Sequence, residues 1–299
     1  MREIAILGAS GSGKTELSLK LANKLNAIIL SLDSLSVYQQ IDIASAKPSQ
    51  EQRGEIPHFG IDILSPKESH NAQIFIQEHQ KAKTYAKNHQ KNLLIVGGTS
   101  FYLKILLEGL SIFPKLTQKE KLAIQQKIDM FPTQESRFTY LKSLDNTTKI
   151  HPNDTYRTNK ALEIYFSTSL TPTQYFHKNP PIPLLKNCEI YEILLSQEEL
   201  QRRITKRTHL MLQKGLIEEV TNLFHCFGNS YQWSKSIGIK EVGQFLQGKF
   251  SKEVLEYLIT THTLQLAKRQ KTFNKTQFQN HFCGNAQEIS QTLLSKNLP

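Results

Sequence analysis

The chain of 299 residues is long enough for one large domain or for a core that carries an inserted segment. Hydrophobic residues make up 38% and charged residues 21%, a composition that predicts a buried core and excludes wholesale disorder. No apolar run approaches the ~18 residues that a membrane helix needs. The formal net charge of +11 favours a polyanionic partner such as a nucleic acid, although a solvated basic surface without a partner would carry the same charge.

The first elements alternate between strands and helices. Residues 4–7 predict a short buried strand, and the segment GASGSGKT at 8–15 turns it into a helix. Residues 27–32 predict a second strand, residues 71–90 a helix, and residues 93–96 a third strand. Strands that are continuous apolar runs, alternating with helices, are typical of a parallel sheet covered on both faces. The sequence therefore predicts an α/β fold.

The pattern changes in the middle of the chain. Residues 113–185 are helical and polar and end in a proline cluster, so we interpret them as a helical insert. A strand at 188–195 resumes the core, and a basic helix at 197–212 and three further helical stretches follow it. The last ~15 residues have a weak pattern and are expected to be frayed. The expected organisation is a first core part at 1–112, the insert at 113–185, and core completion with basic helices at 186–299.

The segment GASGSGKT matches the phosphate-loop pattern G-x-x-x-x-G-K-[ST] in the required context, between a strand and a helix. Glycines let the backbone bend around an anion, and the helix N-terminus adds partial positive charge. Lys14 is expected to reach a terminal phosphate and Thr15 a magnesium ion. The pattern predicts a polyphosphate ligand without naming it. The phosphate-binding residues expected are Gly8, Ala9, Ser10, Gly11, Ser12, Gly13, Lys14 and Thr15.

Asp33 is the acidic residue that follows the second strand. Because the carboxyl ends of parallel strands share one edge, Asp33 should face the bound phosphates, as a general base or a magnesium partner. The alternative is an N-cap or turn aspartate, since Ser31 and Ser34 lie beside it. The third strand ends in Gly97-Gly98-Thr99, where a P-loop kinase or ATPase would usually carry a carboxylate for magnesium.

Cationic residues gather in the last third of the chain. Arg203 and Arg207 are four residues apart on the basic helix and share a face. Paired arginines clamp a diphosphate or follow a nucleic-acid backbone, and a solvated face is the plain alternative. The run AKRQK at 267–271 forms a second basic cluster.

The three cysteines, Cys188, Cys226 and Cys283, are far apart in the sequence. Neither a disulfide framework nor a four-ligand zinc pattern can be drawn from them. His225 beside Cys226, and His281 two residues before Cys283, resemble metal ligands only when read in isolation. Ordinary packing or surface roles are expected for both pairs.

Six blocks, in order, resemble the bacterial tRNA dimethylallyltransferases, also called tRNA isopentenyltransferases. The blocks follow the P-loop and are LDSLSVYQQIDIASAKPS at 32–49, GGTSFYLKILLEGL at 97–110, HPNDTYRTNKALEIY at 151–165, RITKRTHLMLQKGLIEEV, SIGIKE and AKRQKTF. The chain departs from the family pattern at a few positions, where other residues are usual: Ala9-Ser10-Gly11, Lys160, Ile239, Leu264 and Phe273. Leu264 replaces an arginine and removes one expected anion contact.

The resemblance implies a P-loop kinase-like core with a helical insertion domain and a helical C-terminal region. It implies transfer of a dimethylallyl group from dimethylallyl diphosphate to the exocyclic amine of the adenosine 3′-adjacent to the tRNA anticodon, with release of diphosphate. Asp33 would take the amine proton, and Lys14, Arg207 and Mg²⁺ held through Thr15 would stabilise the leaving group. The residues that match tRNA-contacting family segments are Asp33, Ser34, Leu35, Ser36, Thr99, Tyr156, Arg157, Thr158, Asn159 and Lys160.

The insert and the basic helices would then bind the anticodon arm of tRNA. We expect a cytoplasmic monomer that binds no membrane, because the N-terminus MREIAILGAS has no signal pattern and no heptads occur. Two alternatives remain open: a small-molecule P-loop kinase of the shikimate or gluconate type, and a nucleotide-switched RNA-binding protein. The first would not need a basic C-terminal third. The second would need a strand-end acid and a base-specificity motif, and the sequence shows neither. In the main hypothesis, ATP is expected only as a competitor that binds the P-loop and is not turned over.

Overall fold

The computed structural model describes residues 1–296 and divides the chain into two compact units. The first unit holds Met1–Leu107 and the chain from Leu185 onward, and the second holds Glu108–Leu184. The second unit therefore begins five residues before the expected insert at 113–185 and ends one residue before its end. Leu185 belongs to the first unit because its backbone N–H donates to the carbonyl of Leu106 at 2.9 Å.

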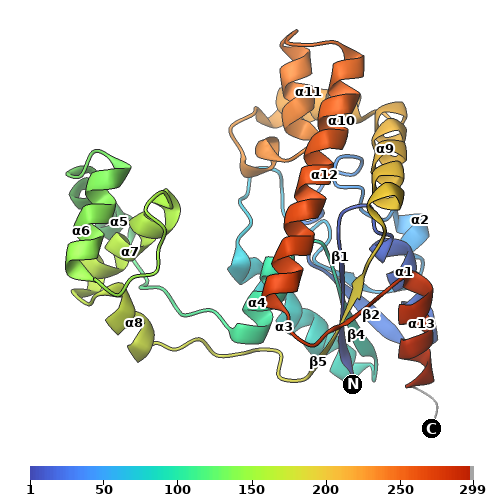
Figure 1. Cartoon of the computed structure of the whole chain (residues 1–299), viewed down its shortest axis with the longest axis horizontal. Helices are drawn as coiled ribbons and strands as arrows, with labels where there is room; N and C mark the ends of the chain where they lie inside the picture. Colours follow the sequence, from blue (N-terminus) through green and yellow to red (C-terminus); the bar gives the residue numbers. More distant parts are fainter. Residues whose placement is uncertain (297–299) are drawn as a thin grey trace. The chain divides into compact units, whose positions relative to one another are not determined.

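A six-stranded parallel sheet forms the centre of the first unit (Figure 1). Its spatial order is β3 (His58–Phe59), β2 (Ala27–Ser31), β4 (Asn92–Val96), β1 (Glu3–Gly8), β5 (Cys188–Ile193) and β6 (Phe282–Gly284). The predicted α/β fold with a parallel sheet is confirmed; β1, β2 and β4 lie where apolar runs predicted them, and β5 lies within the strand expected at 188–195. The edge strands β3 and β6 have only two and three residues, too few for a recognisable pattern.

Helices cover both faces of this sheet (Figure 1). On one face, Ile4 and Ile6 of β1 pack with α1 (Lys14–Lys24) and α13 (Ala286–Ser295). On the other face, α3 (Ala72–Asn88) contacts β2 and β4, and its His79 reaches Glu3 at 3.1 Å. Alternating strand residues thus point to opposite helical layers, as a doubly covered parallel sheet requires.

The expected fraying of the last residues is wrong for 285–296, and residues 297–299 lie outside the described part of the chain. Asn285 caps α13, because its side chain accepts from the backbone N–H groups of Gln287 and Glu288. Ile289 and Leu293 are four residues apart and fully buried against the sheet. A cap and two buried aliphatic side chains are enough to hold this short helix in place.

Four α-helices follow β5 before the last strand of the first unit. They are α9 (Gln197–Gln213), α10 (Leu216–Phe227), α11 (Ile239–Leu246) and α12 (Lys252–Gln277), of which α9 and α12 pack together. The other helices of this unit include α2 (Gln50–Arg53), α4 (Ser100–Glu108) and the 3₁₀ turn η1 (Gln232–Lys235). Within residues 1–296, no helix combines the length and apolar character that a membrane crossing would need.

The second unit consists of helices around a small core of its own. The helices are α5 (Gln118–Asp129), α6 (Gln134–Leu144), α7 (Thr155–Thr168) and α8 (Pro172–Lys178). Ile124 and Ile128 of α5 pack against Leu141 of α6 and Leu162 of α7. This cluster gives the segment a hydrophobic centre separate from that of the sheet.

Candidate active site

The carboxyl ends of three neighbouring strands form the floor of the site. The P-loop follows β1, Asp33 follows β2, and Gly97-Gly98-Thr99 follows β4. The β2 and β4 ends are joined by backbone hydrogen bonds, from Leu32 N–H to the Val96 carbonyl at 2.7 Å and from Thr99 N–H to the Leu32 carbonyl at 3.2 Å. A Cβ at Gly97 would lie 2.3 Å from the Leu32 carbonyl oxygen, so only glycine permits this close approach.

The P-loop has the backbone shape that its sequence predicts. Gly13 adopts φ 93° and ψ 17° immediately before α1, a left-handed conformation that glycine adopts without strain. The Nζ of Lys14 donates to the carbonyls of Gly8 and Ala9, both at 2.8 Å. Lys14 is therefore held at the mouth of the loop, at the N-terminus of α1, where anions bind.

The pKa of Lys14 lies at about 8, well below that of an ordinary lysine. Burial is the main cause and repulsion by Arg207 adds to it, while attraction by Asp33 and Glu192 partly offsets both. With this pKa, Lys14 is mostly protonated at neutral pH but loses its proton more easily than an ordinary lysine. A phosphate anion beside it would favour the charged form.

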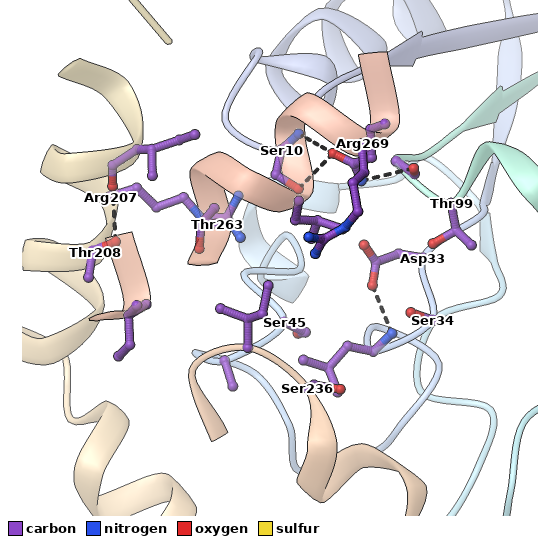
Figure 2. Close-up of a pocket in the computed structure, with 18 of the residues that line it drawn as sticks. Ser10, Asp33, Ser34, Ser45, Thr99, Arg207, Thr208, Ser236, Thr263 and Arg269 are labelled. Carbon is purple, nitrogen blue, oxygen red and sulfur yellow. Dashed lines mark hydrogen bonds between the residues drawn. The ribbon is translucent and has the colours of Figure 1, made fainter. Parts of the chain in front are cut away.

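Asp33 combines a turn role with an oxygen that is open to the site. Its Oδ1 accepts from the backbone N–H groups of Leu35 at 2.8 Å and Ser36 at 3.0 Å. These are the contacts of a turn aspartate, which the sequence left open as an alternative. Among the described residues, both hydrogen bonds to the Asp33 side chain are accepted by Oδ1. Figure 2 shows the carboxylate facing the cavity. The second oxygen is thus placed to accept a proton.

Two joined cavities lie above this floor. The smaller, of about 110 Å³, is lined by Lys14 and Thr15, and the larger, of about 520 Å³, by Thr99 and several apolar side chains. Residues that line both cavities are Ser10, Asp33, Ser45, Gly98 and Arg207. A small polar compartment and a larger, partly apolar one therefore meet at a carboxylate and a guanidinium group.

Two arginines from different helices point into the larger cavity (Figure 2). Arg207 comes from α9, and burial lowers its pKa while Asp33 raises it. Arg269 comes from α12 and was noticed in the sequence only as part of a basic cluster. Leu264, where the family pattern has an arginine, packs in an apolar cluster with Ala9 and Ile204. Arg207, Arg269 and Lys235 are the cationic residues that line this cavity.

Sequence reasoning missed Gln270, which joins the P-loop to the end of β4. Its Oε1 accepts from the backbone N–H of Ser10 at 2.8 Å, and its Nε2 donates to the Gly98 carbonyl at 2.9 Å. Thr263, Leu266 and Gln270 line the same cavity with the spacing of one helix face. That periodicity of α12 is the pattern from which Gln270 could have been predicted.

The remaining predicted residues fall into two places. Ser34, Leu35 and Thr99 line the larger cavity and Ser36 the smaller one. The segment at 156–160 lies on α7, in the second unit.

Within this α7 segment, exposure differs from residue to residue. Tyr156 is 73% exposed, whereas Thr158 is fully buried and its hydroxyl accepts from Gln134 at 3.2 Å. Thr158 therefore supports the packing of α7. Arg157 pairs with Asp154 at 3.3 Å and Lys160 with Glu163 at 2.6 Å. Tyr156 and Arg157 are the exposed members of the segment, and Asn159 and Lys160 are half-buried.

The residues of the smaller cavity fit a magnesium ion. Thr15 offers a hydroxyl and Asp33 a carboxylate, and both line this cavity beside Lys14. Oxygen ligands of this kind, completed by phosphate oxygens and water, are those that Mg²⁺ prefers.

A P-loop at the edge of a parallel sheet, with a carboxylate and arginines over it, defines a phosphate-binding P-loop protein. The IPP transferase family model matches residues 36–277, and the isopentenyl transferase model matches residues 1–57. The chain belongs to the IPP transferase family.

Named relatives and solved structures of the same family are similar to most of this chain. The chain is 50% identical to the tRNA dimethylallyltransferase of Aliarcobacter butzleri over 94% of each chain, and 45% identical to that of Helicobacter pylori strain 26695 over 97% and 93%. Among solved structures, a eukaryotic dimethylallyltransferase acting on tRNA has a TM-score of 0.82 at 28% identity, over 97% of this chain and 75% of the other. The tRNA isopentenylpyrophosphate transferase of Staphylococcus epidermidis has a TM-score of 0.70 at 29% identity, over 99% and 98%.

Proposed function

We propose that the chain transfers the dimethylallyl group of dimethylallyl diphosphate to the exocyclic amine of the adenosine 3′-adjacent to the tRNA anticodon. The observation that carries this proposal is the meeting of the two cavities at Asp33 and Arg207. Family membership, relatives named for this activity and the net charge of +11 support it. We also propose that the chain acts as a monomer.

In this proposal the smaller cavity binds the diphosphate. The loop amides and Lys14 contact its oxygens, and Thr15 holds Mg²⁺. The ion would neutralise charge on the phosphate oxygens. The apolar tail of the donor extends into the larger cavity, which Ile259, Leu266 and Phe273 help to line. Such a donor needs no site for a nucleotide base.

The chain's own residues carry the chemistry at the point where the cavities meet. The amine nitrogen attacks the first carbon of the dimethylallyl group while the bond from that carbon to the diphosphate oxygen breaks. An adenine amine is a poor nucleophile, and the free oxygen of Asp33 accepts its proton as the new bond forms. Lys14 and Arg207 stabilise the negative charge that gathers on the departing diphosphate.

The acceptor adenosine must leave its stack to reach this point, as bases do in other enzymes that modify them. The tRNA would contact Tyr156, Arg157 and Lys160 of α7 and the basic helices of the first unit. Cationic side chains along a backbone gain free energy from counterion release. The segment Ser34–Ser36 would lie beside the reacting base, since it follows Asp33 directly.

The test is single-turnover transfer by Asp33→Asn, with tRNA affinity measured in parallel. We expect a rate loss of ~10²–10⁴-fold with nearly unchanged tRNA affinity, because a positioned base contributes about that much. Glu16→Gln is the matched control: it removes a carboxylate one residue after Thr15, but its side chain is 75% exposed to solvent. A loss of less than about tenfold in Asp33→Asn would remove Asp33 from the role of base.

A second experiment separates this reaction from that of a small-molecule kinase. The protein is incubated with tRNA and Mg²⁺ and with either dimethylallyl diphosphate or ATP, and diphosphate release and nucleoside mass are measured. We expect prenylated adenosine from the first donor and no turnover of the second. Phosphoryl transfer or hydrolysis of ATP at an enzymatic rate, without prenylated adenosine, would support the kinase.

A further inference from the structure

The register of β5 and β6 brings together three side chains that line neither of the two cavities. Glu192 of β5 and Cys283 of β6 are direct partners in the parallel ladder. His281 precedes Cys283 by two residues, so both point to the same side of the strand. A carboxylate oxygen of Glu192, the Nε2 of His281 and the Sγ of Cys283 all lie within 4.8 Å of one another.

The hydrogen bonds of His281 leave a position for a cation. Its Nδ1 lies 3.1 Å from the Phe278 carbonyl, which can only accept, so Nδ1 carries a hydrogen. Its Nε2 lies 2.9 Å from Oε2 of Glu192 and 3.3 Å from Sγ of Cys283. A neutral imidazole would direct a lone pair at the carboxylate, so either a proton or a metal ion must lie between them.

The distances suit a tetrahedral metal ion after a small adjustment. With ordinary zinc bond lengths of about 2.0–2.3 Å, the nitrogen and oxygen ligands would be roughly 3.4 Å apart, and the nitrogen and sulfur roughly 3.6 Å. The observed 2.9 and 3.3 Å must therefore widen by a few tenths of an ångström, and the carboxylate oxygen and the sulfur, which lie within 4.8 Å of each other, must come to roughly 3.6 Å. Cys283 lies on the exposed edge strand β6, where such a movement meets little resistance.

The surroundings hold the carboxylate in place. Glu192 is 4% exposed, and its other oxygen, Oε1, accepts from the side chain of the fully buried Asn274 at 2.7 Å. Outer hydrogen bonds of this kind orient metal ligands. Lys271 and Lys275 line the same pocket but are exposed, so solvent weakens their repulsion of a cation.

We propose that Glu192, His281 and Cys283 form a three-ligand site for Zn²⁺ or a chemically similar divalent transition metal, with water as the fourth ligand. Carboxylate and thiolate together balance the two charges of the ion. The ion would fix β6 and the end of α12 to β5, in a place separate from the P-loop.

The test is a titration of the full-length protein, stripped of metal, with Co²⁺ and then with competing Zn²⁺. A thiolate ligand gives Co²⁺ a near-ultraviolet charge-transfer band, which should saturate at one ion per chain. Cys283→Ser should abolish this band and weaken Zn²⁺ binding by ~10-fold or more, and His281→Gln should weaken the binding of both ions by a similar factor. The matched control is Cys226→Ser, which removes an exposed cysteine beside His225 and should leave band and affinity unchanged.

Thermal unfolding gives a second measurement. Zn²⁺ should raise the melting temperature of the parent and of Cys226→Ser but not of Cys283→Ser, because an ion that binds only the folded state stabilises it. Circular dichroism shows that each variant is folded. If Cys283→Ser binds Zn²⁺ as tightly as the parent, or if no charge-transfer band appears, the proposal is overturned. The cluster is then a hydrogen-bonded pair of His281 and Glu192 that binds no metal ion.

Discussion

Gln270 should be a positioning residue whose loss slows the reaction without weakening tRNA binding. Gln270→Met keeps the length of the side chain but removes its hydrogen bonds to Ser10 and Gly98, at 2.8 and 2.9 Å. Each such bond contributes about 0.5–1.5 kcal/mol net, so the two contribute about 1–3 kcal/mol to holding the P-loop against the end of β4. If this energy aligns the reacting groups, the turnover rate falls by about 5–150-fold.

Gln270→Glu separates the two contacts. The carboxylate still accepts from Ser10 N–H, but its second oxygen faces the Gly98 carbonyl, an acceptor against an acceptor. It also places negative charge beside the diphosphate. We therefore expect this variant to raise the KM for dimethylallyl diphosphate as well as to lower kcat. Gln265→Met changes an exposed glutamine on the same helix and should match the parent in both.

The assay is steady-state prenylation of tRNA, with kcat and both KM values, alongside tRNA affinity and thermal unfolding. A purely structural role would lower the unfolding temperature without moving kcat at a temperature where the protein is folded. If Gln270→Met and Gln265→Met have equal kcat under those conditions, the hydrogen bonds of Gln270 do not position the P-loop for the reaction.

Three further predictions follow from charge and packing. Burial and a neighbouring arginine hold the pKa of Lys14 at about 8, so affinity for dimethylallyl diphosphate should be full below pH 8 and fall by up to ~tenfold per pH unit above it. Lys14→Met should bind the diphosphate weakly at every pH, without this inflection in the pH profile of affinity. Arg157→Glu should weaken tRNA binding and reduce its log–log salt slope by ~0.7–0.9, whereas Lys24→Glu, at the far end of α1 from the P-loop, should leave the slope unchanged. Gly97→Ala places a Cβ 2.3 Å from the Leu32 carbonyl oxygen and should destabilise the fold by ~1–3 kcal/mol, measured by denaturant unfolding; unchanged stability would show that the two strand ends can separate freely.

Much of the fold and part of the site were predictable because their causes are local. Buried strands of a parallel sheet are apolar runs, and the P-loop pattern follows the first of them directly. Asp33 was predicted at the sheet edge from one general rule, that parallel strands share their carboxyl ends. The insert at 113–185 was predicted from its polar helical pattern, whereas the compact unit at Glu108–Leu184 has other ends, and the Leu185–Leu106 hydrogen bond at its border cannot be inferred from that pattern.

Contacts between distant residues could not be predicted. Gln270 meets Ser10 across 260 positions, and His281 meets Glu192 across 89. Edge strand β6 is only three residues long, yet its register decides that Cys283 lies opposite Glu192. The sequence alone gave His281 and Cys283 no third ligand, and ordinary packing was the reasonable expectation. Which side chains from different elements meet can be predicted only when the order of the strands in the sheet is known.

The end of β4 also bears on which reaction this P-loop supports. Kinases anchor magnesium with a carboxylate near such a strand end. Here a side chain at Gly97 would begin 2.3 Å from the Leu32 carbonyl oxygen, and one at Gly98 would begin 2.6 Å from Nε2 of Gln270. The backbone contact therefore excludes an acidic side chain at Gly97, and one at Gly98 would have to displace the Gln270 side chain that joins the P-loop to β4. Asp33 is left as the carboxylate among the residues that line the two cavities. A single carboxylate facing an amine on one side and a diphosphate on the other favours alkyl transfer over phosphoryl transfer.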